Sequence, residues 1–152
     1  SLPLIQEEHA DECQELDAAA KYEHAFLDFT GFLPHTMNDE QNALVSNGQW
    51  LVDRMQQLML TAMGDRLAGH ALHVGYVSFD GSVSPPGFTA TTLHDGCHIT
   101  AHAYEDIGLL AMDVLVKGVP VMPIVEALIR DLGDVPGIHR VQFQCANRQA
   151  QA

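Results

Sequence analysis

The fold can be predicted from the segment Leu93-His94-Asp95-Gly96-Cys97-His98-Ile99-Thr100-Ala101-His102-Ala103-Tyr104. From residue 97 onward its small or apolar side chains alternate with polar ones, and a period of two is typical of a β-strand. Such a strand would place Cys97 on one face and both His98 and His102 on the other. The segment holds three histidines, a cysteine and an aspartate, so it is also the first candidate for a functional site.

Other strand-like runs lie on both sides of this segment, separated from it by turn residues. Glycine, proline and serine are concentrated between residues 80 and 87, which predicts a loop there. Alternation and β-branched or aromatic residues predict strands at residues 21–31, 68–79, 88–93, 98–104, 109–116 and 139–144.

Two helices are predicted between these strands. Asn38, with Gln41 three residues later, matches a capping box. Apolar residues at helical spacing extend this helix to about Gly64, and Ser46-Asn47-Gly48 is a point at which it can kink. A shorter helix lies between Pro123 and Gly133. The order β-α-β-β-β-β-α-β predicts an α/β (α+β) fold, a two-layer sandwich with helices on one face of a mainly antiparallel sheet.

Length and charge restrict the partners of the chain. At 152 residues it is expected to form one main domain, residues 22–146, between an acidic N-terminal arm (1–21) and a tail (147–152). Within the arm, residues 5–20 read as a solvated helix or a partly ordered segment. The net charge is −13 with seven basic residues, which argues against a nucleic-acid partner and favours a cationic ligand.

The sequence shows no sign of a membrane or secretory segment. It contains no run of eighteen apolar residues, and acidic residues stand near the N-terminus where a signal peptide would be basic and then apolar. We therefore expect a cytoplasmic protein without a membrane partner. The cysteines, Cys13, Cys97 and Cys145, are odd in number and lack metal-type spacing, so no disulfide framework is expected.

Several motifs resemble the small prokaryotic S-adenosylmethionine decarboxylases. Cys97 to His102, followed by Tyr104, Asp106 and Gly108, is similar to the segment in which these enzymes cleave themselves. His24 to Gly31 is similar to their opening strand, H-L-x-x-D-x-x-G. The resemblance covers roughly residues 22 to 133, and includes a turn at Pro86-Gly87-Phe88-Thr89 and a helix entry at Gly118 and Pro123. It implies the same two-layer fold, a homodimer, and sites near the subunit interface.

The resemblance also implies a cofactor made from the chain itself. In this family a serine attacks the preceding peptide bond, and cleavage converts the serine into a pyruvoyl group that accepts electrons during decarboxylation. Here Gly96-Cys97 stands at the position of the family's Glu-Ser bond, and a thiol can perform the corresponding N-to-S shift. Cys97 is therefore the expected pyruvoyl precursor, and no metal is expected.

The remaining roles are carried over position by position. His102 matches the family's processing histidine and Thr89 its processing serine. Asp106 matches a substrate-side glutamate, and His98 is expected to contact substrate as well. Lys117 stands at the place of the family's catalytic cysteine, the proton donor, and Gly81 at the place of a family histidine. The substrate implied is S-adenosylmethionine or a related cationic ligand.

Structural roles compete with these functional ones. Cys97 could be a buried small hydrophobe, and His102 a hydrogen-bonded strand histidine. Lys117 could be a base or imine former if buried, or a lysine that protects an edge strand from aggregation. His94, His98 and His102 suggest a zinc site, but four-residue steps along a strand separate side chains by about 13 Å. These three alone cannot form one site, although one of them could join His70 or His73 from a neighbouring strand.

Two functional hypotheses remain from the sequence. The first is a pyruvoyl-dependent carboxy-lyase that decarboxylates S-adenosylmethionine for spermidine synthesis, provided that self-cleavage at Gly96-Cys97 occurs. The second is a homologue that does not process itself and binds a ligand or partner. A decarboxylase for another amino acid is a variant of the first.

Overall fold

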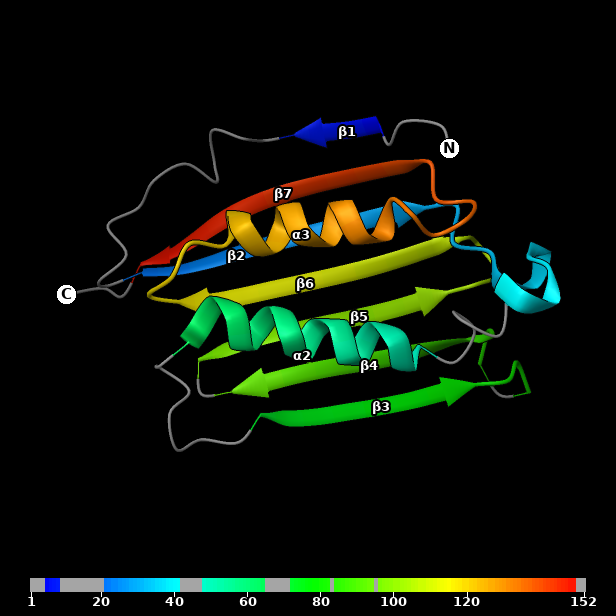
Figure 1. Cartoon of the computed structure of the whole chain (residues 1–152), viewed down its shortest axis with the longest axis horizontal. Helices are drawn as coiled ribbons and strands as arrows, with labels where there is room; N and C mark the ends of the chain where they lie inside the picture. The colour runs from blue at the N-terminus through cyan, green and yellow to red at the C-terminus, as the bar shows by residue number, and fades with distance from the viewer. Residues whose placement is uncertain are drawn as a thin grey trace.

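One sheet organises the molecule. The computed structural model describes residues 5–8, 21–41, 48–64, 72–82, 84–94 and 96–149. Within these residues seven strands form one sheet in the order β1-β7-β2-β6-β5-β4-β3 (Figure 1). The strands are β1 (Ile5–Glu8), β2 (Lys21–Thr30), β3 (His73–Phe79), β4 (Gly87–His94), β5 (Cys97–Tyr104), β6 (Leu109–Lys117) and β7 (Arg140–Gln149). Every neighbouring pair is antiparallel except β1 and β7, which are parallel.

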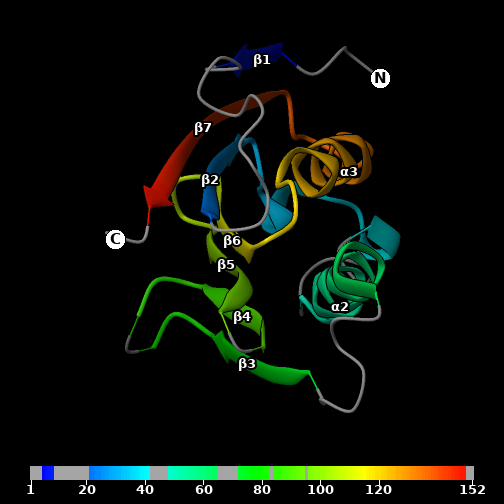
Figure 2. The same ribbon diagram turned by 90° about the vertical axis from the view of Figure 1, so that its left-hand side faces the viewer.

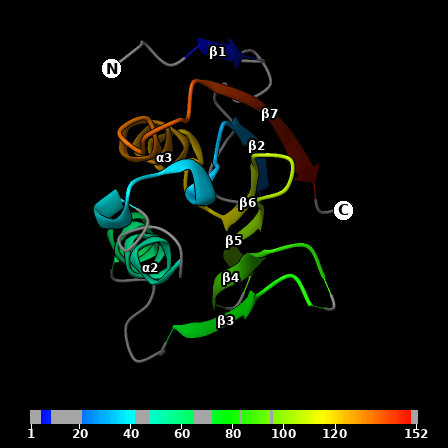
Figure 3. The ribbon, with the colours of Figure 1, turned by 90° about the vertical axis from the view of Figure 1, so that its right-hand side faces the viewer.

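Two helices cover one face of this sheet. Helices α2 (Gln49–Met63) and α3 (Met122–Leu132) lie side by side on the same face and run in opposite directions (Figures 1 and 2). A 3-10 turn, η2 (Pro34–Thr36), follows β2. In the described part of the chain no helix covers the opposite face, which we call the open face (Figure 3). The predicted two-layer sandwich with a mainly antiparallel sheet is therefore confirmed.

Alternation along the strands divides the side chains between the two faces. In β5, burial alternates residue by residue, with Cys97, Ile99 and Ala101 buried against the helices. Apolar residues recur at helical spacing along α2 and α3 and close the core from the other side. The largest fully buried side chains are Leu27, Phe29, Phe32, Leu51, Met55, Met59, Phe88, Ile99, Leu110, Met112, Ile124 and Leu128.

The first predicted helix is not continuous. Its capping box is confirmed, because Gln41 N–H donates to Asn38 Oδ1 at 2.8 Å and Asn38 N–H donates to Gln41 Oε1 at 3.3 Å. Residues 42–47 lie outside the described residues, and α2 begins anew after Gly48. That residue has a left-handed φ of 69°, and a Cβ there would lie 2.9 Å from the Phe88 ring. Gly48 therefore starts α2 anew, at the point where the sequence predicted a kink.

Three other details differ from the sequence prediction. Ile5–Glu8 is strand β1 on the edge of β7, whereas a solvated helix or loose arm was expected; residues 9–20 lie outside the described residues. Strand β7 extends to Gln149, beyond the predicted end at residue 144. Cys145 is disulfide-bonded, contrary to expectation, and its partner lies outside the described residues.

The N-terminus of α3 is tied to the sheet by a buried carboxylate. Glu23 on β2 is 7% exposed, and its Oε2 accepts a hydrogen bond from the backbone N–H of Val121 at 2.5 Å. A carboxylate at a helix N-terminus is favoured by the helix dipole.

None of the helices in the described ranges is long and apolar enough to cross a membrane.

Candidate functional site

Cys97 is held in a tight hairpin and buried beneath α2. It is the first residue of β5, directly after Gly96, whose φ is +75°. The residue is 3% exposed and its Sγ lies 3.8 Å from Met63 Sδ. The backbone N–H of Lys117 donates to Sγ at 3.4 Å. The sulfur thus donates toward Met63 and accepts from Lys117 N–H, so both contacts fix the position of the thiol.

Lys117 lies beside this hairpin, as expected if it acts with Cys97. It ends β6, and its Cδ would be 3.3 Å from a Cβ on Gly96. Its Nζ lies 5.6 Å from the centre of the Tyr22 ring, within the range of a cation–π contact. Strand β6 is flanked by β2 and β5, so the edge-strand role considered for Lys117 is wrong. The side chain is exposed, so a role based on burial has no support either.

Thr89 and His102 form a second cluster, on the open face. They are directly opposite each other on β4 and β5, with Thr89 Oγ1 3.1 Å from His102 Nδ1. The His102 ring also stacks on Tyr104, with 6.3 Å between ring centres. Because Thr89 engages Nδ1, a proton would be exchanged with a substrate at Nε2. The resemblance assigned both residues to self-processing, but neither it nor the sequence spacing predicted this contact.

The two proposed substrate contacts lie far from each other along β5. His98 is on the open face near the Cys97 end, with its ring centre 6.1 Å from that of His24. Asp106 is exposed in the turn between β5 and β6, at the other end of the strand. One small ligand bound to a single chain would therefore not contact both side chains.

The predicted catalytic residues thus form two groups in one chain. The thiol group is Cys97 with Lys117, and the imidazole group is Thr89 with His102. Cys97 and His102 are five positions apart along β5, a distance of about 16 Å in an extended strand. The two side chains also leave opposite faces of the sheet. A single chain does not bring the two groups to one substrate.

The open face contains two carboxylates that sequence reasoning missed. Asp28 on β2 and His102 on β5 are both opposite Ala111 of β6, so the three form one row across the strands. Asp113 lies in the next row, opposite Thr100. Burial raises the pKa of Asp28, and the negative charge of Asp113 raises it further. Only the strand order brings these residues beside His102, and that order is not visible in local sequence patterns.

The raised pKa of Asp28 predicts that replacing this residue increases the stability of the protein in a pH-dependent way. A carboxylate whose pKa is raised on folding stabilises the native state only at low pH, and this contribution is lost as the pH rises through its native pKa. At pH 7 we expect Asp28→Asn to increase the free energy of unfolding by a few tenths of a kcal/mol, since the site is partly solvated. Urea unfolding at pH 7 and at pH 3.5 would show the gain at the higher pH only.

Asp80 provides a control of opposite sign. Hydrogen bonding from the Ser82 side chain, and then from Ser82 N–H at 2.8 Å, lowers the pKa of the Asp80 carboxyl group. Asp80→Asn should therefore decrease stability at pH 7 and have no such effect at low pH. A gain at both pH values for Asp28→Asn would mean that packing, and not charge, explains the change.

The described residues show no metal centre beside these clusters. Within the described ranges, no group of three or more histidine, cysteine, aspartate or glutamate side chains is arranged to hold a metal ion. On the open face Thr100 lies between His98 and His102, as the strand spacing predicts.

Comparison with known proteins concerns the fold. No protein-family model matches the chain, and no curated protein matches it in sequence. A solved structure, the adenosylmethionine decarboxylase from Aquifex aeolicus VF5, superimposes with a TM-score of 0.57 at 19% identity. The chain has an S-adenosylmethionine decarboxylase-like fold. The match covers 88% of this chain and 94% of that one. At this identity it shows the fold alone.

Proposed function

We propose that the chain is a self-processing, pyruvoyl-dependent decarboxylase that acts on S-adenosylmethionine in polyamine synthesis. The observation that carries this proposal is the position of Cys97 in a decarboxylase-like fold. It is a thiol at the start of a strand, after a glycine in a tight turn, and it accepts a hydrogen bond from Lys117 N–H. Its place matches the cleaved residue that the sequence resemblance implies.

Cleavage would use groups that the chain already holds near Cys97. Its Sγ attacks the carbonyl carbon of Gly96, and the C–N bond breaks to give a thioester and a new amino terminus. Elimination then releases a thiocarboxylate on Gly96 and leaves dehydroalanine at position 97. Its imine form is hydrolysed to a pyruvoyl group and ammonia. The pyruvoyl group would supply an electron sink for loss of carbon dioxide, and Lys117, which lies beside the hairpin, would donate a proton.

A second copy of the chain would complete the site. The thiol group and the imidazole group are about 16 Å apart in one chain, so each needs a counterpart from elsewhere. The open face also exposes large apolar side chains, which a monomer rarely leaves uncovered. They are Phe26, Val77, Phe79, Leu93 and Tyr104. In a homodimer, Thr89 and His102 of one chain would meet the other chain at its Gly96-Cys97 hairpin, where Gly96 and Lys117 are not fully buried although the Cys97 side chain is.

The substrate class follows from charge. S-adenosylmethionine carries a sulfonium cation, and a chain with a net charge of −13 attracts cations. Phe26 lies directly opposite Asp113 on the open face. An aromatic ring beside a carboxylate suits a sulfonium. His98 and Asp106, at opposite ends of β5, would contact substrate from different chains of the dimer.

A homologue that binds a ligand without processing itself is the second candidate. The feature that favours it is the burial of Cys97 against Met63, with glycine where the family has glutamate. Such a protein would keep the fold and the open face without cleavage. Processing with a reshaped pocket, as Lys117 and Gly81 suggest, would instead give a decarboxylase for another amino acid.

The intact mass of freshly purified protein tests the proposal. Self-processing predicts two fragments that separate at Gly96-Cys97, the C-terminal one with a pyruvoyl group, in place of one species near 16.6 kDa. Borohydride should reduce that carbonyl and abolish activity. The matched control is Cys97→Ala, which should remain whole. A wild-type chain that stays intact for days at neutral pH, with and without S-adenosylmethionine, would contradict processing and support the second candidate.

A further inference from the structure

A groove runs between α2 and α3 at the surface of the helix layer. Its volume is about 590 Å³, within the range of small-ligand sites. Helix α2 lines one side with Leu58 and Ala62, and α3 lines the other with Ile124 and Ala127. Its lining residues belong to the two helices and to the approach to α3, not to the strands, so the groove is separate from the open face and from the function proposed above.

The two ends of the groove differ in character. Because α2 and α3 run in opposite directions, Arg54, early in α2, lies beside the end of α3 that carries Arg130 (Figure 1). The other end is lined by Thr61 of α2 and, on the approach to α3, by Val119 and Pro120. The groove therefore has a charged end and a mostly apolar body.

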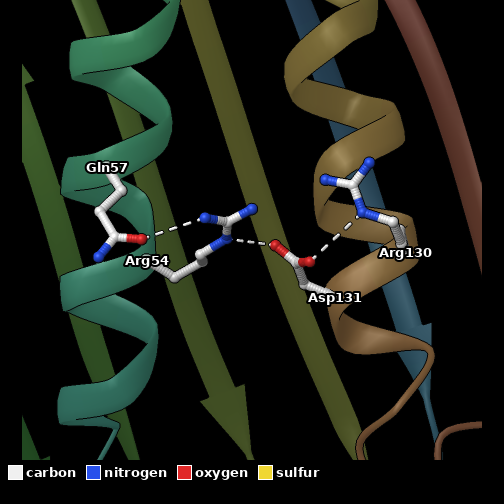
Figure 4. Close-up of polar contacts among 4 residues, drawn as sticks. All are labelled: Arg54, Gln57, Arg130 and Asp131. Atoms are coloured by element: carbon white, nitrogen blue, oxygen red, sulfur yellow. Dashed lines mark hydrogen bonds and ion pairs between the residues drawn. The ribbon is translucent and has the colours of Figure 1, made fainter.

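The arginine end is organised by one carboxylate. Arg54 Nε donates to Asp131 Oδ2 and Arg54 Nη1 donates to Gln57 Oε1 at 3.1 Å, while Arg130 Nε lies 3.6 Å from Asp131 Oδ1 (Figure 4). Two guanidinium groups thus share one carboxylate, and together the three groups carry one positive charge. These contacts use two of the roughly five N–H donors of Arg54. A guanidinium group that is fixed by such contacts and still has unused N–H donors suits a ligand carboxylate.

Charge distribution makes this end unusual in the molecule. The chain has seven basic and 20 acidic residues, yet two of the seven basic residues line this groove. Glu126 lies on the rim one helical turn before Arg130 and opposes a negative ligand. With Glu126 the four charges cancel, so a single anionic group would be held by the arginine N–H donors that the contacts above leave unused, and a multiply charged ligand is disfavoured.

We propose that the groove between α2 and α3 binds a small amphipathic anion, a carboxylate with an unbranched hydrocarbon tail. The carboxylate bonds to Arg54 and Arg130. The tail lies along Leu58, Ile124 and Ala127 toward Pro120. From residue 54 to residue 62 α2 rises about 12 Å, which accommodates a tail of roughly eight to ten carbons.

Titration of the full chain with decanoate, below its micelle concentration, tests this proposal. Calorimetry should give one saturable site in the micromolar range, and decanol should bind at least about tenfold more weakly because its head group carries no charge. Arg130 is 68% exposed, so Arg130→Gln should preserve the fold. It should weaken decanoate about threefold to fivefold, while Glu126→Gln should strengthen it by a similar factor.

Arg140→Gln on β7 is the matched control, since it changes the net charge of the chain as Arg130→Gln does but lies outside the groove. It should leave decanoate affinity unchanged. Circular dichroism and melting temperatures check that each variant is folded. The proposal is overturned if decanoate shows no saturable binding, if decanol binds equally well, or if neither groove variant alters the affinity. None of these outcomes depends on cleavage at Cys97.

Discussion

Cys97→Ala and His102→Ala chains are each expected to remain uncleaved and to lose decarboxylation, and their co-production is expected to restore about a quarter of the wild-type sites. In the proposed dimer each site combines Cys97 of one chain with His102 of the other. A mixed dimer of the two variants then has one intact site and one doubly defective site. Statistical mixing makes about half of the dimers mixed, which gives the quarter.

A reciprocal mixture distinguishes this arrangement from a site within one chain. Wild-type chain co-produced with a Cys97→Ala/His102→Ala double variant should again give about a quarter of the sites if they are shared between chains. If each chain forms its own site, the first mixture should give none and the second about half. Intact mass spectrometry of the cleaved fraction gives the ratio directly, and decarboxylation follows it. Size-exclusion chromatography confirms that the variants still associate.

The alternation of side chains that predicted strand β5 also predicted that the candidate site residues are divided between the two faces of the sheet. It predicts Cys97 on one face and His98 and His102 on the other, and the burial of β5 confirms this. The resemblance nevertheless grouped Cys97 and His102 into one catalytic set. Side chains an odd number of positions apart along a strand point to opposite faces of the sheet. Such a set therefore needs either two chains or a different grouping.

Contacts between distant segments could not be predicted in the same way. Lys117 reaches Cys97 through the pairing of β5 with β6, and Asp28 reaches the row of His102 through the pairing of β6 with β2. Neither register follows from the local pattern. The parallel pairing of Ile5–Glu8 with β7 joins segments more than 130 residues apart, and its polar composition resembles a solvated arm. Local signals identified the elements from β2 onward but not β1, while the register determined which side chains meet.

The other large effect is expected at Gly31, where Gly31→Ala should reduce the free energy of unfolding by about 3 kcal/mol or more. Gly31 has a left-handed φ of 99°, and a Cβ there would lie 2.1 Å from the carbonyl oxygen of Gly137. The obstacle is backbone that other bonds hold in place. Gly31 N–H donates to Gly108 O at 2.8 Å, and His139 N–H donates to Thr30 O at 3.1 Å.

Gly81→Ala separates the cost of the backbone angle from the cost of the collision. Gly81 has a similar φ of +95°, but the atom nearest to its Cβ position is Pro86 Cδ at 3.6 Å, an ordinary contact. That variant should lose only about 1 kcal/mol, the cost of the left-handed conformation. Urea unfolding of both variants gives the difference. Equal losses would show that the connection before β7 moves aside, and that the approach of Gly31 to Gly137 is not a constraint.

The position of Gly31 also separates stability from processing. Its contact with Gly108 places it at the Asp106 end of the sheet, whereas Cys97 lies at the end where Tyr22 begins to pair with Lys117. Below its melting temperature, Gly31→Ala should therefore keep the wild-type extent of cleavage despite its lower stability. Loss of cleavage in a chain that is still folded would mean that the two ends of the sheet are coupled. In that case the thiol group would depend on more than the hairpin that holds it.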